Sequence, residues 1–341
     1  MSEPARALLG RKVVVEVPAT VANLGAGYDC LGLAIDLALV VSVEARSREE
    51  GRPSRADKLE VTGEGAGELE AGKTGKGNRF IEGLEAGLAA TGFDDLDGVG
   101  WRIAMTNPIP LARGLGSSGA ATVAGLLAAA VLGHPPGKLA SLYASRLAEP
   151  SSELRQGLLA LATRIEDHPD NVAPALLGGF VASLAVGGEV EAFRFDLPAE
   201  LRVVLFIPDV RLATAEMRRV LPDVVPRADA LANLARVAHG VAGIASGRLN
   251  VLRHLTEDRL HEPYRAAAFP ELPELEAAAR GAGAIGVCLA GSGSTIAAFA
   301  LPDAVDSVGQ ALAQAAADRS LAGRVQVHAA RNAGASIVAD G

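Results

Sequence analysis

The segment Asn107–Leu127, NPIPLARGLGSSGAATVAGLL, constrains the fold more than any other part of this 341-residue chain. Prolines end a predicted strand, a short loop follows, and an alanine-rich run then predicts a helix. The loop glycines are Gly114, Gly116 and Gly119, and its serines are Ser117 and Ser118. We expect the glycines to take positive φ and approach a ligand closely, and the serines to act as N-caps and hydroxyl donors. Free N–H groups and the positive end of the helix dipole would then face a phosphate, so the segment predicts a nucleotide site.

The same glycines also spell G-x-G-x-x-G, the fingerprint of dinucleotide-binding proteins. That fingerprint requires a βαβ unit with an acidic residue about 20 residues on, at the end of the next strand. Here the predicted helix 120–133 is followed by predicted helices at 138–149 and 152–167, so the strand is missing. A Walker loop is excluded because no Gly-Lys-Ser/Thr follows the glycines. The remaining alternative is a small-residue turn that packs a helix tightly.

Composition leaves the enzyme interpretation open and excludes several other classes. Hydrophobic residues make up 49% of the chain, enough for two domains, and the net charge is −8 with scattered basic residues. This balance argues against a nucleic-acid or anionic-membrane surface. The apolar run Ala120–Leu132 is too short to span a bilayer, and Met1–Lys12 lacks a signal-peptide core. Cys30 and Cys288 are expected to be buried thiols in a reducing cytoplasm.

Periodicity and turn residues predict an alternation of strands and helices along the whole chain. The expected strands cover 12–17, 37–45, 58–62, 101–106, 178–184, 191–196, 201–207, 286–289, 295–300 and 324–328. Besides those around the glycine loop, the expected helices cover 78–91, 214–220, 227–246, 250–256, 272–281 and 303–318. After residue 171 the sequence pattern changes from predicted helices to predicted strands, so a second domain is expected to begin near residue 178.

Three glycine-bearing segments share one explanation. The first is Pro18–Gly32 (PATVANLGAGYDCLG), the second is Pro110–Ala121, and the third is Gly286–Thr295. In this order they resemble the three motifs of the GHMP kinases, the galactokinase, homoserine, mevalonate and phosphomevalonate kinase superfamily. The first segment and the run His168–Phe180 (HPDNVAPALLGGF) are similar to the forms found in the homoserine kinases. The resemblance extends over Val13–Phe299.

This resemblance implies an α+β fold of two domains. Residues 1–177 would form the ATP-binding domain, like domain 2 of ribosomal protein S5, and residues 178–341 a ferredoxin-like domain. The implied reaction transfers the γ-phosphoryl group of ATP to the hydroxyl of L-homoserine, giving O-phospho-L-homoserine for threonine biosynthesis, and a homodimer is compatible with it. Another kinase of the superfamily, of the mevalonate type, is the alternative. The arginine pair Arg218 and Arg265 separates the two, since mevalonate-type substrates do not need the ammonium site that Asp29 would provide.

The resemblance also implies residues that hold the amino acid. Asn23 and Asp29 would bind its ammonium side, and Arg218 and Arg265 would clamp its carboxylate, because planar guanidinium groups bind carboxylates in a bidentate manner. The remaining substrate residues by resemblance are His168, Thr214 and Gly291. Without the motifs, Asp29 would be interpreted as a turn-forming residue and the two arginines as solvated or ion-paired surface side chains.

A second implied set binds MgATP. The nucleotide residues would be Asn78, Pro110, Arg113, Gly114, Leu115, Gly116, Ser117, Ser118, Gly119 and Ala120, with Asn78 near the adenine. Ser118 and Glu166 are the candidate ligands of Mg²⁺, which prefers oxygen donors, and Asn171 would face the transferred phosphate. Asp170 is the only nearby carboxylate that could serve as a base, and the resemblance implies direct in-line transfer by positioning and charge stabilisation instead.

Overall fold

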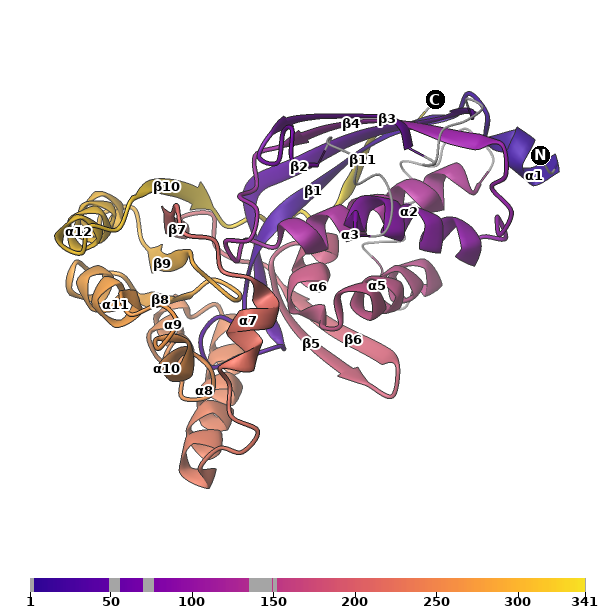
Figure 1. Cartoon of the computed structure of the whole chain (residues 1–341). Helices are drawn as coiled ribbons and strands as arrows, with labels where there is room; N and C mark the ends of the chain where they lie inside the picture. The colour runs from indigo at the N-terminus through magenta and orange to yellow at the C-terminus, as the bar shows by residue number, and fades with distance from the viewer. Residues whose placement is uncertain (1–2, 49–55, 70–76, 135–148, 150–151, 341) are drawn as a thin grey trace.

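The computed structural model describes residues 3–48, 56–69, 77–134, 149 and 152–340. Two β-sheets, each with helices on one side, lie side by side (Figure 1). The strands of the first sheet are β1 Lys12–Ala22, β2 Leu31–Ser47, β3 Ala56–Gly63, β4 Val99–Asn107, β5 Phe180–Val186, β6 Glu189–Phe195 and β11 Ser336–Asp340. Its helices are α1 Glu3–Leu8, α2 Arg79–Ala90, α3 Ser117–Leu132, α5 Glu153–Glu166 and α6 Pro169–Leu177.

The first sheet has seven strands in the order β11-β1-β2-β4-β3, with β5 paired to β2 and β6 paired to β5. The pair β3 and β4 is parallel, and the others are antiparallel. Alternation decides which face of β4 is buried: Trp101, Ile103 and Met105 point into the core, while Arg102 and Thr106 point out of it. Such alternation is the pattern of a sheet with one covered face.

Helices α2, α3, α5 and α6 cover that face (Figure 1). Helix α3 is buried along almost its whole length because it lies between the sheet and the other helices. Small residues permit this close packing. A Cβ on Gly125 would lie 2.1 Å from the carbonyl oxygen of Phe80 in α2, so only glycine fits there. This packing fixes the position of α3 relative to α2.

The second sheet has four antiparallel strands in the order β10-β7-β9-β8. These are β7 Arg202–Pro208, β8 Gly286–Leu289, β9 Ile296–Ala300 and β10 Gly323–Ala329. Helices α11 Leu272–Gly281 and α12 Val305–Asp318 pack on one face with a core of their own. The remaining helices are α7 Thr214–Arg219, α8 Arg227–Ala245, a 3-10 turn at Leu249–Val251, α9 Leu252–Leu255 and α10 Glu262–Arg265.

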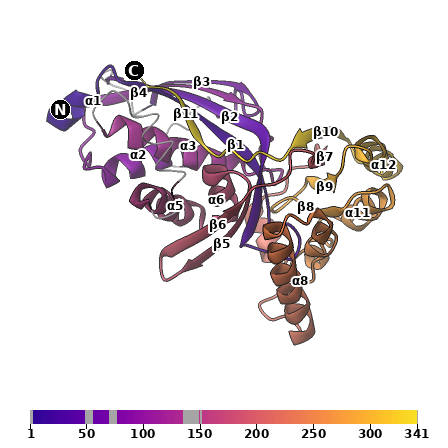
Figure 2. The ribbon, with the colours of Figure 1, turned by 180° about the vertical axis from the view of Figure 1, so that it is seen from behind.

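The chain crosses between the sheets more than once. The hairpin β5–β6 follows residue 177 yet pairs with β2, and β11 returns from the second sheet to β1 (Figure 2). The seven-stranded sheet therefore includes three strands from beyond the predicted division at residue 177, and that division stays a prediction.

Most predicted elements are confirmed, with ends shifted by a few residues. The second strand is longer than predicted, since β2 begins at Leu31. Helices α1, α6 and α10 and strand β11 had no prediction. The helix predicted at 138–149 falls almost entirely outside the described residues. Within the described part of the chain, no helix is long and apolar enough to cross a membrane.

Candidate active site

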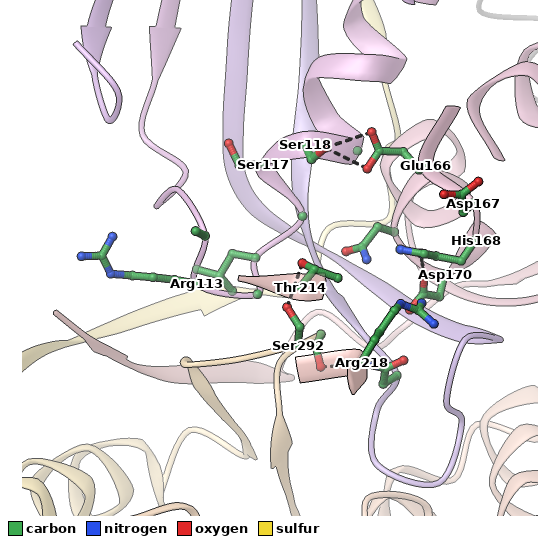
Figure 3. Close-up of a pocket in the computed structure, with 18 of the residues that line it drawn as sticks. Arg113, Ser117, Ser118, Glu166, Asp167, His168, Asp170, Thr214, Arg218 and Ser292 are labelled. Atoms are coloured by element: carbon green, nitrogen blue, oxygen red, sulfur yellow. Dashed lines mark hydrogen bonds and ion pairs between the residues drawn. The ribbon is translucent and has the colours of Figure 1, made fainter. Parts of the chain in front are cut away.

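The three glycine-bearing segments meet around one cavity of about 480 Å³ between the two sheets (Figure 3). Every predicted site residue except Asn78 and Ala120 lines it. The predicted residues in its wall are Asn23, Asp29, Pro110, Arg113, Gly114, Leu115, Gly116, Ser117, Ser118, Gly119, Glu166, His168, Asn171, Thr214, Arg218, Arg265 and Gly291. Arg79, Ala112, Asp167, Asp170, Ala215 and Ser292 complete the wall. Segments far apart in sequence thus converge as the motif order implied.

The glycine loop takes the strained backbone that was expected at two of its three glycines. Gly114 has φ 80° and Gly116 has φ 68°. A Cβ on Gly114 would lie 1.9 Å from the carbonyl oxygen of Ala290 in the third motif, so the two motifs pack backbone against backbone. Gly119 is instead helical, within the first turn of α3, and the prediction of positive φ there is wrong. A Cβ on Gly119 would lie 3.2 Å from the Cβ of Asn171, so the glycine leaves room for the Asn171 side chain.

The N-terminus of α3 is open to the cavity. Its N-cap is Gly116, and no side chain among the described residues caps it, so the prediction that Ser117 and Ser118 serve as caps is wrong. The first N–H groups of the helix therefore keep their hydrogen-bonding capacity for a ligand. Together with the helix dipole, these groups are suited to binding an anion.

The Ser118 hydroxyl bonds to Glu166 instead (Figure 3). It donates to Oε1 at 2.9 Å or Oε2 at 2.8 Å of a carboxylate that is 8% exposed. Thr122 Oγ1 donates to Oε1 at 2.7 Å, and Arg79 Nε lies 3.3 Å from the same oxygen. Arg79 also donates to the carbonyl oxygen of Ile165 at 3.0 Å. Thr122 and Arg79 thus both contact Oε1. Oε2 and the Ser118 hydroxyl oxygen lie together beside the open end of α3, as two oxygen atoms that could bind a cation.

The run after Glu166 brings an imidazole, a carboxyl and an amide to the same wall. Asn171 Oδ1 accepts a hydrogen bond of 2.8 Å from Thr20 Oγ1, which fixes the amide beside the glycine loop. His168 Nδ1 bonds to the buried carboxylate of Asp170. Burial is the largest single effect and lowers the pKa of His168, but the hydrogen bond to Asp170 and the charges of Asp170 and Asp29 together raise the pKa above its ordinary value.

Asp29 lies beside His168 and Asp170, with ligand atoms of the three side chains within 4.8 Å of one another, and forms a bidentate ion pair with Arg218. Arg218 Nη1 lies 3.0 Å from Oδ2 and Nη2 lies 2.7 Å from Oδ1. Their side chains are 32% and 37% exposed, so the pair is open to the cavity. Burial alone would lower the pKa of Arg218, but the bond to Asp29 raises it.

Arg265 is buried at 1% exposure behind this pair. Its Nη1 donates to the carbonyl oxygen of Gly291 at 2.8 Å and approaches His261 Nδ1 at 3.1 Å. No carboxylate of a described residue lies within ion-pair distance of its guanidinium. Burial lowers its pKa. A buried cation without a counter-ion is costly, so an anionic ligand at this position would be strongly favoured.

Several predicted residues hold the site together rather than face its centre. Asn23 Nδ2 donates to the carbonyl oxygen of Gly291 at 2.8 Å, and its Oδ1 accepts from the Asp29 backbone at 3.0 Å. The first and third motifs are thereby joined. Thr214 Oγ1 lies 3.1 Å from Ser292 Oγ, which ties α7 to the third motif (Figure 3).

Two predicted nucleotide residues direct their side chains elsewhere. The Arg113 guanidinium points away from the cavity (Figure 3) and donates to the carbonyl oxygens of Pro208, Leu111 and Asp209. Asn78 caps α2, its Oδ1 accepting the N–H groups of residues 80 and 81. Ala120 is fully buried in α3.

Arg79 is the functional candidate that the sequence did not reveal. It is the first residue of α2, and its neighbour Asn78 was the only signal pointing to that helix end. Nothing local connects it to Glu166, which lies at the end of a different helix. Only the packing of α2 against α5 brings them together.

Comparison with known proteins places the chain in a family. The profile described as GHMP kinases N terminal domain matches residues 78–179, and the one described as GHMP kinases C terminal matches residues 225–318. The homoserine kinase of Moorella thermoacetica is 39% identical over 95% of this chain and 99% of the relative. A homoserine kinase of Thermus thermophilus is 41% identical over 83% of this chain and 85% of the relative. The chain belongs to the homoserine kinases.

Solved structures of GHMP kinases share the fold. The crystal structure of homoserine kinase from Cytophaga hutchinsonii has a TM-score of 0.76 at 26% identity, covering 96% of this chain and 97% of that one. The crystal structure of L. major mevalonate kinase with R-mevalonate has a TM-score of 0.65 at 16% identity, covering 98% of this chain and 100% of that one. At that identity the likeness shows the fold alone. The predicted two-domain α+β fold and the family resemblance are confirmed.

Proposed function

We propose that this protein transfers the γ-phosphoryl group of ATP to the side-chain hydroxyl of L-homoserine, giving O-phospho-L-homoserine. The observation that carries the proposal is the arrangement of charge in one cavity. An open helix N-terminus with oxygen donors beside it forms one end. At the other end, the Asp29–Arg218 pair and the buried Arg265 offer one anionic and two cationic groups. An amino acid has the complementary charges.

ATP would place its phosphates on the glycine loop. The N–H groups at the start of α3 would bind phosphate oxygens, and Ser118 Oγ with Glu166 Oε2 would hold Mg²⁺, since two adjacent oxygen donors suit this hard cation. The bound cation would neutralise the β and γ oxygens as charge develops. Thr122 and Arg79 hold the other carboxylate oxygen and so keep the Glu166 side chain oriented.

Homoserine would bind by exchanging partners within the Asp29–Arg218 pair. Its ammonium takes the Asp29 carboxylate, and its carboxylate takes Arg218 and Arg265. Each charge keeps a partner throughout, so the exchange avoids leaving a buried charge uncompensated. The hydroxyl then lies toward Asn171 and the glycine loop.

The transfer itself would depend on alignment and charge stabilisation. Asn171 Oδ1 is held by Thr20, which leaves the amide N–H₂ to donate to a phosphate or hydroxyl oxygen. Asp170 is engaged by His168 and buried, so it is poorly placed to accept the substrate proton. No phosphoenzyme is required.

A coupled assay of ADP release tests the proposal. Purified protein with MgATP is given homoserine, mevalonate, galactose or shikimate in turn, and the product is identified by phosphorus NMR. Homoserine-dependent ADP release with a new phosphomonoester signal is expected. Turnover of mevalonate but not homoserine would instead favour the mevalonate-type alternative.

A further inference from the structure

Tyr28 lies in the first motif next to Asp29 and contacts both arginines of the carboxylate clamp. Arg218 Nη1 donates a hydrogen bond of 2.9 Å to the Tyr28 hydroxyl. The centroid of the ring lies 5.6 Å from the guanidinium carbon of Arg218 and 5.4 Å from that of Arg265. Both distances are within the range in which an aromatic ring attracts a cation.

This ring offsets the repulsion between two neighbouring cations. Arg218 and Arg265 must converge on one substrate carboxylate, and the charge of Arg218, after the larger effect of burial, lowers the pKa of Arg265. A shared aromatic ring gives each guanidinium a weakly negative surface to rest against. The clamp can then stay assembled while Arg218 exchanges Asp29 for the substrate.

The ring is itself held in place. It packs against the imidazole of His261 with centroids 5.0 Å apart and planes inclined by 30°. His261 Nε2 lies 2.9 Å from the carbonyl oxygen of Gly25, which can only accept, so Nε2 carries the proton. Nδ1 is therefore free to accept from Arg265 Nη1 at 3.1 Å. Burial lowers the pKa of His261 to about 4, so this neutral tautomer persists at physiological pH.

The hydroxyl of Tyr28 stays neutral for the same reason. Burial raises the pKa of Tyr28, and the neighbouring Asp29 raises it further. A neutral hydroxyl accepts from Arg218 without competing for it as an anion would.

We propose that Tyr28 is the positioning residue of the carboxylate clamp, its ring holding Arg218 and Arg265 at the spacing that a substrate carboxylate requires. This inference rests on the proposed function. The ring carries most of the effect because it touches both arginines, whereas the hydroxyl touches one. Tyr28 therefore determines how strongly the site favours a substrate with a carboxylate.

The test compares Tyr28→Phe, which keeps the ring, with Tyr28→Leu, which removes it. The substrates are homoserine and 3-aminopropan-1-ol, which is homoserine without the carboxylate. In Tyr28→Leu we expect kcat/KM for homoserine to fall on the order of tenfold, mainly through KM. The value for 3-aminopropan-1-ol and the KM for MgATP should stay unchanged, and Tyr28→Phe should keep at least about a third of the parent's homoserine efficiency. Tyr264→Leu, beside Arg265 on α10, is the matched control and should behave as the parent.

Equal losses with both substrates in Tyr28→Leu would overturn the proposal, as would a parent-like preference for homoserine in that variant. If Tyr28→Leu does not fold, Tyr28→Met fills the same space with a flexible apolar chain, and the same substrate ratio decides. Failure of the proposed function would look different, since the parent protein would then not phosphorylate homoserine at all.

Discussion

The carboxyl groups of Glu262 and Glu276 predict how stability depends on pH. The two carboxyls are close enough for the charge of Glu276 to raise the pKa of Glu262, and Glu262 Oε1 accepts from the Leu289 N–H at 2.8 Å. Glu276 Oε1 is buried and has no hydrogen-bond partner among the described residues. A proton shared by the two carboxyls would give this oxygen a hydrogen bond. Burial raises the pKa of Glu276 to about 7, although Arg280 opposes it, and burial with the Glu276 charge raises that of Glu262 well above normal.

The sign and size follow from linkage. The pKa of Glu276 rises from 4.5 when unfolded to about 7 when folded, so the folded state holds its proton more tightly. The stability this contributes is complete below pH 4.5 and is lost as the pH rises through 7. At about 1.4 kcal/mol per pH unit, roughly 2 to 3 kcal/mol separates pH 5 from pH 8.5. Glu276→Gln is neutral at every pH and should keep that contribution.

Urea unfolding at pH 5, 6, 7 and 8.5, followed by circular dichroism, measures the difference between parent and Glu276→Gln. The variant should gain stability relative to the parent as the pH rises, by roughly 2 kcal/mol over the range. Glu274→Gln is the control two residues earlier on α11, where the carboxylate is exposed and paired with Arg319. A difference between parent and Glu276→Gln that is the same at all four pH values would refute the shared proton.

Four further outcomes test the site. Glu166→Gln should lower turnover, raise the Mg²⁺ concentration needed for half-maximal rate, and weaken Mn²⁺ binding measured by electron paramagnetic resonance; a parent-like metal titration would assign the cation elsewhere. Truncating Arg218 or Arg265 to alanine should lower kcat/KM for homoserine on the order of thirtyfold, which corresponds to about 2 kcal/mol, and should leave the KM for MgATP unchanged. Unaltered steady-state kinetics in both variants would show that these arginines do not bind the substrate carboxylate. In calorimetry, Asp29→Asn should bind homoserine more weakly than the parent but 4-hydroxybutyrate more tightly, because Arg218 no longer pairs with Asp29. Weaker binding of both compounds would contradict the partner exchange. Calorimetry should also show MgATP binding with no heat from NAD or NADP, and micromolar dinucleotide binding without MgATP binding would count against the kinase site.

Sequence patterns predicted the elements well where packing follows local periodicity. Helix α3 could be predicted because a run of alanine, glycine and leucine suits a helix buried on all sides. Helix α6 could not, since Pro169 and Pro174 within nine residues suggest a loop. Pro169 fits because it occupies the first helical turn, where its missing N–H is not needed.

Side-chain direction was beyond the reach of the sequence. Ser118 stood at a helix start, where capping is the usual role, yet its hydroxyl bonds to Glu166 in another helix. Arg113 belongs to the glycine loop as the motif implied, but the carbonyl oxygens at the end of β7 draw its guanidinium away. Motif resemblance therefore predicted which segments form the cavity, while long-range partners decided which of their side chains face it.

The charges of the cavity also explain why the end proposed to bind the amino acid is stable without substrate. Arg218 and Asp29 neutralise each other, so neither carries the full cost of being partly desolvated and alone. Arg265 relies on a carbonyl oxygen, an imidazole and an aromatic ring, which together solvate it without a counter-ion. A ligand with only one charge would break the Asp29–Arg218 pair and leave one member unmatched, whereas a zwitterion replaces the pair with two new ones and adds a partner for Arg265. Under the proposed function, selection for an amino acid would thus follow from the resting ion pair itself, before any contact with the rest of the substrate is counted.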